Sequence, residues 1–203
     1  ISENGEREFE GLTGIPVCSR VKTGTKKNTL ERKKTKRREE SMKTGFIGLG
    51  IMGRPMAKNL LKAGVDLIVT DLNKEAVKDV VAAGAQEGTY EEIGKECGVV
   101  FIMVPSGDIT KSILFGEGGV ASFIKEGSIV CDMSSVTPVE SKECYERLKE
   151  IGVGFVDAPV SGGETGGING TLAIMAGRDQ NDIDVLATYF DHIGSSDLLI
   201  VSA

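Results

Sequence analysis

The chain has 203 residues, a hydrophobic content of 40% and a formal net charge of −6, which suits a domain with a buried core. Only 5% of its residues are aromatic and Trp is absent, which argues against a base-stacking nucleic-acid platform. Its apolar runs are shorter than the ~20 residues of a membrane span, and a single histidine, His192, cannot build a metal cluster.

The charge divides unevenly along the chain. Residues 1–43 carry twelve Lys/Arg and seven Asp/Glu, a net charge of +5. Residues 44–203 carry twelve Lys/Arg and 23 Asp/Glu, a net charge of −11. Residues 1–41 show neither a helical nor a strand period, and Lys33 to Arg38 form a nearly continuous basic run. We expect a disordered or non-native tail over 1–41, a boundary near Met42 and a folded domain over 42–203.

The folded part opens with a short apolar run that leads into Gly48-Leu49-Gly50-Ile51-Met52-Gly53, a G-x-G-x-x-G pattern, and then into a helical pattern over 52–63. Strand, glycine turn and helix in this order are the context of a dinucleotide-binding fingerprint. Gly48 would allow the tight turn, Gly50 would let a pyrophosphate approach the backbone, and Gly53 would let the helix pack closely on the strand. Free N–H groups and the positive end of the helix dipole would face the phosphates.

Strand and helix patterns alternate through the rest of the chain. We expect strands at 65–70, 99–104, 128–132, 155–158 and 172–176, and an edge strand at 198–201. We expect helices at 73–84, 89–97, 137–151 and 181–190, and a loop over the glycine-dense segment before residue 172. The unbroken apolar run at 99–104 is typical of a parallel sheet covered on both faces. The predicted fold class is α/β, a Rossmann-type doubly wound, mainly parallel sheet.

Ligands of such folds bind at the carboxyl ends of the strands. The notable residues expected there are Asp71, Pro105, Ser106, Ser134, Ser135 and Asp157. Asp71 ends the second strand and can accept both ribose hydroxyls of an adenosine, which favours NAD over NADP because a carboxylate repels a 2′-phosphate. Lys74 is within reach of a phosphate, so NADP stays open, and Asp71 as a plain turn or capping residue is the alternative.

Four motifs in the same order resemble the β-hydroxyacid dehydrogenase family, which includes 3-hydroxyisobutyrate dehydrogenase and tartronate semialdehyde reductase (2-hydroxy-3-oxopropionate reductase). They lie at 45–53, 103–106, 131–138 and 157–172. The resemblance covers about residues 42–193. The related 6-phosphogluconate dehydrogenases share the nucleotide domain, but Gly170-Thr171-Leu172 fits the hydroxyacid branch better.

The resemblance implies a cofactor site made of Gly48, Leu49, Gly50, Ile51, Met52, Gly53, Asp71, Val104, Pro105 and Ser135. It also implies that Ser161, Gly162 and Gly163 hold the substrate carboxylate, and a Ser-Gly-Gly turn can indeed expose successive N–H groups to an anion. The implied reaction is hydride transfer between NAD, or NADP, and a small hydroxy acid or semialdehyde. A cytoplasmic protein whose full-length form is a homo-oligomer is expected, with no metal and no membrane partner.

One feature departs from the family pattern. The family's general base is a lysine on a helix beyond the nucleotide domain, and after Arg178 this chain has no lysine or arginine. No catalytic residue is therefore assigned, and we expect a fragment or truncated reading frame that binds cofactor but turns over poorly. The competing hypothesis is a non-catalytic dinucleotide-binding module whose basic run docks on nucleic acid, and the net charge of −11 beyond residue 43 argues against it.

Overall fold

The structure is a computed structural model that describes residues 43–177, 179–195 and 199–201. The predictions made for the tail 1–41, for Met42 and for the basic run lie outside these residues. The domain boundary near Met42 stays a prediction.

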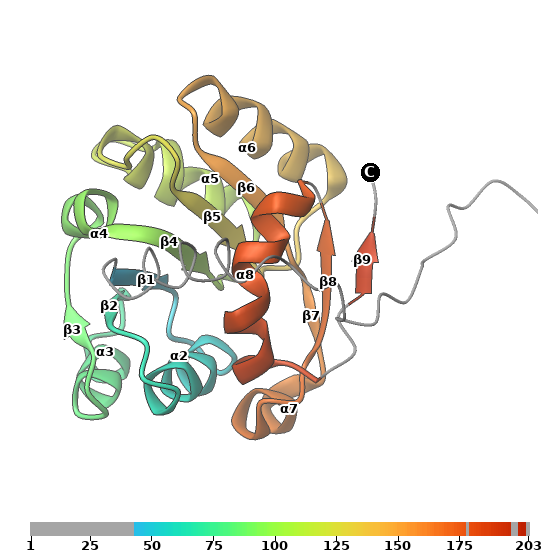
Figure 1. Cartoon of the computed structure of the whole chain (residues 1–203). Coiled ribbons are helices and arrows are strands. Elements are labelled where there is room, and N and C mark those ends of the chain that lie inside the picture. Colours follow the sequence, from blue (N-terminus) through green and yellow to red (C-terminus); the bar gives the residue numbers. More distant parts are fainter. Residues whose placement is uncertain (1–42, 178, 196–198, 202–203) are drawn as a thin grey trace, which may run out of the picture.

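A mainly parallel sheet forms the centre of the domain (Figure 1). Its strands are β1 Lys43–Ile47, β2 Leu67–Thr70, β3 Gln86–Glu87, β4 Cys97–Ile102, β5 Ile129–Asp132, β6 Gly154–Asp157, β7 Val160–Ser161, β8 Ala173–Gly177 and β9 Leu199–Val201. They run in the order β3-β2-β1-β4-β5-β6-β8-β7, with β9 paired to β8. The first six strands in this order, β3-β2-β1-β4-β5-β6, are all parallel. β8 is antiparallel to β6 and β7, and β9 is parallel to β8. The order 3-2-1-4-5-6 is that of the Rossmann fold, so the predicted fold class is confirmed.

Helices cover both faces of the sheet (Figure 1). One face carries α2 Gly53–Lys62, α3 Lys74–Val81 and α8 Gln180–Ile193. The other carries α4 Tyr90–Glu96, α5 Gly107–Phe115, a 3₁₀ turn at Val120–Ser122 and α6 Pro138–Glu150. A further short helix, α7 Gly163–Asn169, packs against α2. In the described part of the chain, no helix combines the length and apolarity that crossing a membrane requires.

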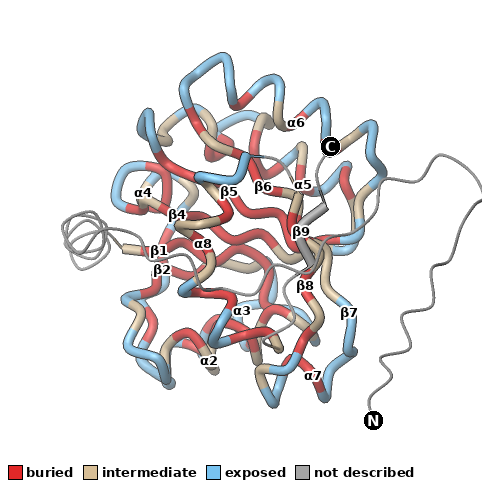
Figure 2. The backbone as a smooth tube through the Cα atoms, turned by 45° about the vertical axis from the view of Figure 1, so that its right-hand side comes forward, coloured by how far each residue is buried: buried red, intermediate tan, exposed pale blue. Residues whose placement is uncertain are grey.

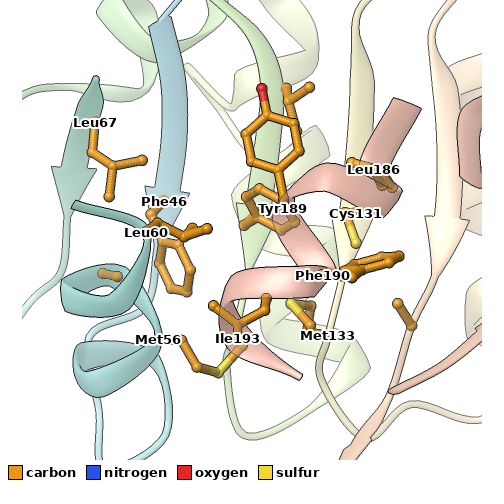
Figure 3. Packing of buried hydrophobic residues seen from close by; sticks show 14 of the residues in the cluster. Phe46, Met56, Leu60, Leu67, Cys131, Met133, Leu186, Tyr189, Phe190 and Ile193 are labelled. Atoms are coloured by element: carbon orange, nitrogen blue, oxygen red, sulfur yellow. The ribbon is translucent and has the colours of Figure 1, made fainter. Parts of the chain in front are cut away.

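The two faces hold separate hydrophobic cores because side chains alternate along each strand. In β1, Phe46 enters the core under α2, α3 and α8, and its neighbour Ile47 enters the core under α4, α5 and α6. The Phe101 ring stacks on Phe46 at 6.0 Å and meets Tyr189 of α8 edge-on at 5.4 Å. Figure 2 shows the strands as the buried interior, and Figure 3 shows the packing around Phe46. Each such buried side chain contributes roughly 1.5–3 kcal/mol, which fixes β1 and β4 at the centre of the sheet.

Helix caps follow the sequence closely. Asn73 accepts the N–H groups of Glu75 and Ala76 at the start of α3, and complete capping boxes begin α4 at Thr89 and α6 at Thr137. These side chains satisfy backbone donors that the first turn of a helix leaves unpaired. The two capping boxes thus fix where α4 and α6 begin, and His192 is exposed in the last turn of α8.

Five elements differ from the sequence expectation. The segment predicted to be only a glycine-dense loop contains α7, and four further elements were not predicted: α5, the 3₁₀ turn at Val120–Ser122, and the two-residue strands β3 and β7. Glycine is a poor helix former, but in α7 close packing outweighs this preference, because a Cβ on Gly167 would lie 3.3 Å from Pro55 Cγ of α2. Tertiary contact therefore decides the conformation of a segment whose local propensity indicates a loop.

The described cysteines, Cys97, Cys131 and Cys144, are buried and free. Burial raises the pKa of the Cys97 thiol to about 12 and that of the Cys144 thiol to about 11, and it raises the pKa of Cys131 as well. These thiols are therefore protonated core side chains, not reactive groups. The fourth cysteine, Cys18, lies outside the described residues.

Candidate functional site

The carboxyl ends of five parallel strands form one edge of the sheet. Strand pairing places Thr70, Ile47, Ile102, Asp132 and Asp157 in one row across β2, β1, β4, β5 and β6. The chain leaves β1 toward the face of α2 and leaves β4 toward the face of α5. Strand ends that diverge to opposite faces leave a crevice between them, so the candidate site lies at the β1/β4 switch point.

The glycine turn after β1 lines this crevice. Gly48 has φ +95°, and a Cβ there would collide with the Met103 carbonyl after β4. A Cβ on Gly53 would collide with the Gly48 carbonyl. Gly50 differs from both, because it is exposed and a Cβ on it would meet nothing within 4 Å. Two of the glycines are thus required by the fold, and the third leaves backbone uncovered at the point where a pyrophosphate is expected.

Helix α2 begins at this turn without a side-chain cap. Its N-cap residue, Met52, makes no side-chain hydrogen bond to the first turn, and that turn contains no acidic residue. The first N–H groups of a helix and the positive end of its dipole favour an anion when no carboxylate neutralises them. Residues 48–53 therefore fit a phosphate group by geometry and by charge.

Asp71 follows β2 and is anchored to the glycine turn. Its Oδ2 accepts the N–H of Leu49 at 2.5 Å and its Oδ1 accepts the N–H of Asn73 at 2.6 Å. Each carboxylate oxygen keeps a further lone pair for a ligand hydroxyl. Burial and the nearby Asp71 charge raise the pKa of the Tyr90 phenol. The carboxylate predicted to bind ribose thus stands directly beside the turn predicted to bind phosphate.

The loops after β4 and β5 are joined by a buried serine. The Ser134 hydroxyl accepts the N–H of Val104 at 3.0 Å, and the Ser134 N–H donates to Asp132 Oδ1 at 3.0 Å. Burial raises the pKa of the Asp132 carboxyl despite these hydrogen bonds from Ser134. Ser134 is fully buried, whereas Ser135 and Pro105 are exposed. Ser134 therefore positions the loop of Val104 and Pro105, a structural role that its place at a strand end did not specify.

The predicted substrate turn, Ser161 to Gly163, is exposed and leads into α7. Gly162 and Gly163 have φ of +138° and +61°, values that favour glycine. Helix α7 is tied to α2 by Asn59, whose Nδ2 donates to the carbonyl oxygens of Gly167 at 2.8 Å and Ile168 at 3.3 Å. Asn59 was not predicted as a site residue, because its only signal in the sequence is that of a weak helix former inside a helix. The role of the turn toward a substrate stays a prediction.

A cavity of about 310 Å³ lies beside the crevice, between α2, α3 and α7. It is lined by Ile51, Arg54, Pro55, Lys58, Asn59, Lys62, Asp79, Glu164 and Ile168. Of the predicted cofactor residues only Ile51 is among these, so this cavity is a neighbour of the candidate site and not the site itself. Within the residues described, no cluster of three or more His, Cys, Asp or Glu side chains is placed to hold a metal ion.

A glycine turn at the switch point of a 3-2-1-4-5-6 sheet, with an acid at the end of β2, defines a dinucleotide-binding α/β domain. The sequence model of the NAD binding domain of 6-phosphogluconate dehydrogenase matches residues 43–201, and the chain belongs to this family.

Curated relatives and solved structures agree with the family. The chain is 39% identical over 159 residues to 2-hydroxy-3-oxopropionate reductase of Escherichia coli, covering 78% of this chain and 54% of the relative. It is 41% identical over 157 residues to 2-(hydroxymethyl)glutarate dehydrogenase of Eubacterium barkeri, covering 77% and 52%. The structure of Mycobacterium tuberculosis 3-hydroxyisobutyrate dehydrogenase with L-serine superposes with a TM-score of 0.75 at 26% identity, covering 80% of this chain and 55% of that one. The chain thus spans about half the length of these relatives.

Proposed function

We propose that this chain is the cofactor-binding part of an NAD-dependent oxidoreductase that acts on a small hydroxy acid. The observation that carries the proposal is the uncovered backbone at Gly50, beside an uncapped helix start and within reach of the Asp71 carboxylate. The relatives that match over three quarters of the chain have names that describe dehydrogenation or reduction of small hydroxy or oxo acids.

The residues present fit a dinucleotide in this arrangement. The turn from Gly48 to Gly53 would hold the pyrophosphate through backbone N–H groups from Gly50 onward, because those of Gly48 and Leu49 already donate to Thr70 and Asp71. Asp71 would accept the adenosine ribose hydroxyls. Val104 and Pro105 would line the cofactor at the end of β4, and Ser135 would meet its nicotinamide end. The bound cofactor supplies hydride chemistry, and the protein's part is alignment of the reacting groups.

The proposed substrate is a 3-hydroxy acid or tartronate semialdehyde (2-hydroxy-3-oxopropionate). Its carboxylate would bind the backbone N–H groups and hydroxyl of Ser161, Gly162 and Gly163. Two observations support this placement: Ser161 to Gly163 are exposed, and α7 behind them is held to the cofactor helix α2 by Asn59. No described residue of this chain is assigned as the proton-transferring base. A cytoplasmic location and a homo-oligomeric full-length form remain proposals.

A titration of the chain with NADH tests the proposal. We expect saturable binding that is weakened slightly in Gly50→Ala and at least tenfold in Gly50→Val, because each added carbon occupies the space left for the pyrophosphate. Both variants should fold normally, which circular dichroism can check. Equal NADH affinity in the wild type and in folded Gly50→Val would contradict the proposal.

A further inference from the structure

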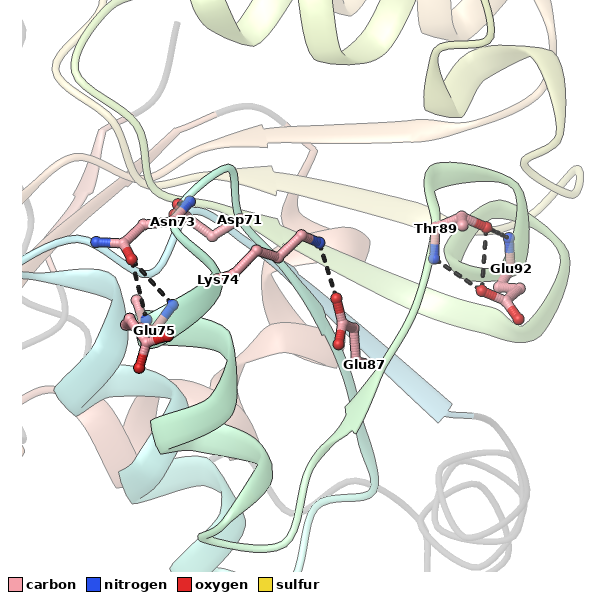
Figure 4. A network of polar contacts seen from close by, with 8 residues as sticks. Asp71, Asn73, Lys74, Glu75, Glu87, Thr89 and Glu92 are labelled. Atoms are coloured by element: carbon pink, nitrogen blue, oxygen red, sulfur yellow. Dashed lines mark hydrogen bonds and ion pairs between the residues drawn. The ribbon is translucent and has the colours of Figure 1, made fainter.

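Lys74 is the cation nearest along the chain to the Asp71 carboxylate, and its position decides whether a 2′-phosphate finds a partner there. It begins α3, three residues after Asp71. Its ammonium group does not stand free: Lys74 Nζ lies 2.8 Å from Glu87 Oε1. Figure 4 shows the Lys74 side chain extended from the turn after Asp71 toward Glu87.

The sheet holds Glu87 in that place. β3 pairs with β2 in parallel, and the register sets Glu87 opposite Val69, two residues before Asp71. The Gly88 N–H donates to the Val69 carbonyl at 3.0 Å, which continues the pairing beyond β3. A Cβ on Gly88 would collide with Ile68, so the backbone beside Glu87 is packed tightly against β2. The acid is therefore fixed by backbone pairing on the strand next to the ribose end of the proposed site.

The charges at this end of the site discriminate between the two dinucleotides. NADP differs from NAD by a 2′-phosphate with close to two negative charges, which would come against Asp71. A cation near the end of β2 normally accommodates that phosphate. Here two carboxylates, Asp71 and Glu87, stand near one ammonium group, that of Lys74, and this ammonium is already paired with Glu87.

We propose that Glu87 is a specificity-determining residue that holds Lys74 away from the adenosine ribose and thereby favours NAD over NADP. The inference rests on the proposed cofactor site and adds a residue outside the glycine turn and outside the Asp71 position. The side chains of Lys74 and Glu87 are 65% and 50% exposed, and exposed ion pairs are weak. The effect should therefore be a modest change in cofactor preference and not an absolute block.

Binding of NADH and NADPH to the whole chain tests this proposal, in the wild type, Glu87→Gln, Lys74→Gln and the double variant. At low salt, Glu87→Gln should bind NADPH about fivefold more tightly, ~1 kcal/mol, with NADH affinity changed less than twofold. Lys74→Gln should remove this gain, so the double variant should bind NADPH no better than Lys74→Gln alone. Glu146→Gln is the matched control, since it breaks an exposed pair with Lys142 on the distant helix α6 and should change neither affinity.

Three outcomes separate the inference from the proposed function. Unchanged NADPH affinity in Glu87→Gln, with normal NADH binding, would overturn the inference and leave the proposed function standing. A gain that persists in the double variant would also overturn it, because Glu87 would then act on the phosphate directly and not through Lys74. Absence of NADH binding in the wild type would overturn the proposed function itself, and the inference with it.

Discussion

Gly53, the first residue of α2, lies against the carbonyl oxygen of Gly48 with no room for a Cβ between them. This contact sets how closely the helix approaches β1, and so it aims the first turn of α2 at the crevice. Gly50 lies between the two in sequence, but its missing side chain faces open space. The same motif therefore contains glycines that the fold needs and one that a ligand needs.

We expect Gly53→Ala to lower the free energy of unfolding by ~1–3 kcal/mol, because the helix must shift to admit the methyl group. Gly50→Ala is the matched control and should change that free energy by less than ~0.5 kcal/mol. Urea denaturation followed by circular dichroism measures both. Similar losses in the two variants would show that Gly50 is also a packing residue.

The adjacent serines after β5 give a second matched pair. Ser134→Ala leaves the partly buried N–H of Val104 without its acceptor, so the free energy of unfolding should fall by ~1–3 kcal/mol. Ser135→Ala removes an exposed hydroxyl and should leave stability unchanged while it weakens NADH binding. Thermal unfolding and NADH titration of both variants check this. A larger stability loss in Ser135→Ala than in Ser134→Ala would contradict the assigned roles.

Asp132 should make stability depend on pH. Burial raises its folded-state pKa above the ordinary 3.8, so the folded state binds its proton more tightly than the unfolded state. Its contribution to stability is then fully present below 3.8 and is lost as pH rises through the raised folded pKa. The side chain that Asp132→Asn introduces does not titrate. As pH rises from about 3.5 to about 6, the free energy of unfolding of this variant should therefore increase relative to that of the wild type.

Asp79 provides a control of opposite sign for that pH series. The hydrogen bond from Lys58 lowers the pKa of Asp79 below 3.8, so its contribution is present above 3.8 and is lost as pH falls through the lowered folded pKa. Asp79→Asn should therefore have a lower free energy of unfolding than the wild type at about pH 6, and this difference should shrink in strong acid. Urea denaturation across the pH range measures both variants, and parallel pH profiles of wild type and Asp132→Asn would refute the role given to burial.

The contact between α2 and α7 yields a fourth prediction. Asn59→Asp keeps the size of the side chain but removes the donor to Gly167 and Ile168, which should cost ~1 kcal/mol or more. The loss should be local, so amide exchange should accelerate in α7 more than in α3. Uniform acceleration across both helices would indicate that Asn59 supports the fold as a whole and not α7 in particular.

The elements with strong local signals were predictable from sequence. The glycine turn, the buried strand β4 and the capping boxes of Thr89 and Thr137 each rest on backbone or side-chain chemistry within a few residues. They fixed the order of strands and helices and hence the edge on which the site lies. The acid at Asp71 could be placed at the same edge for that reason.

What escaped prediction depends on contacts between distant segments. Helix α7 forms where propensity indicates a loop because Gly167 packs on Pro55, more than a hundred positions away. The sequence does not indicate that Ser134 is buried and Ser135 is exposed, because the path of the loop after β5 decides which side chain points inward. The pairing of Lys74 with Glu87 requires β3 to lie beside β2, and β3 has too few residues to show a strand pattern.

The central claim is that a dinucleotide binds the carboxyl edge of the sheet between β1 and β4. Titration of the ¹⁵N-labelled chain with NADH, followed by amide chemical shifts, tests it most directly. We predict that the largest shifts fall on residues 48–53, on Asp71 and on Val104, with saturation in a common concentration range. Saturating shifts confined to the cavity between α2, α3 and α7, or no shifts at all, would contradict the claim.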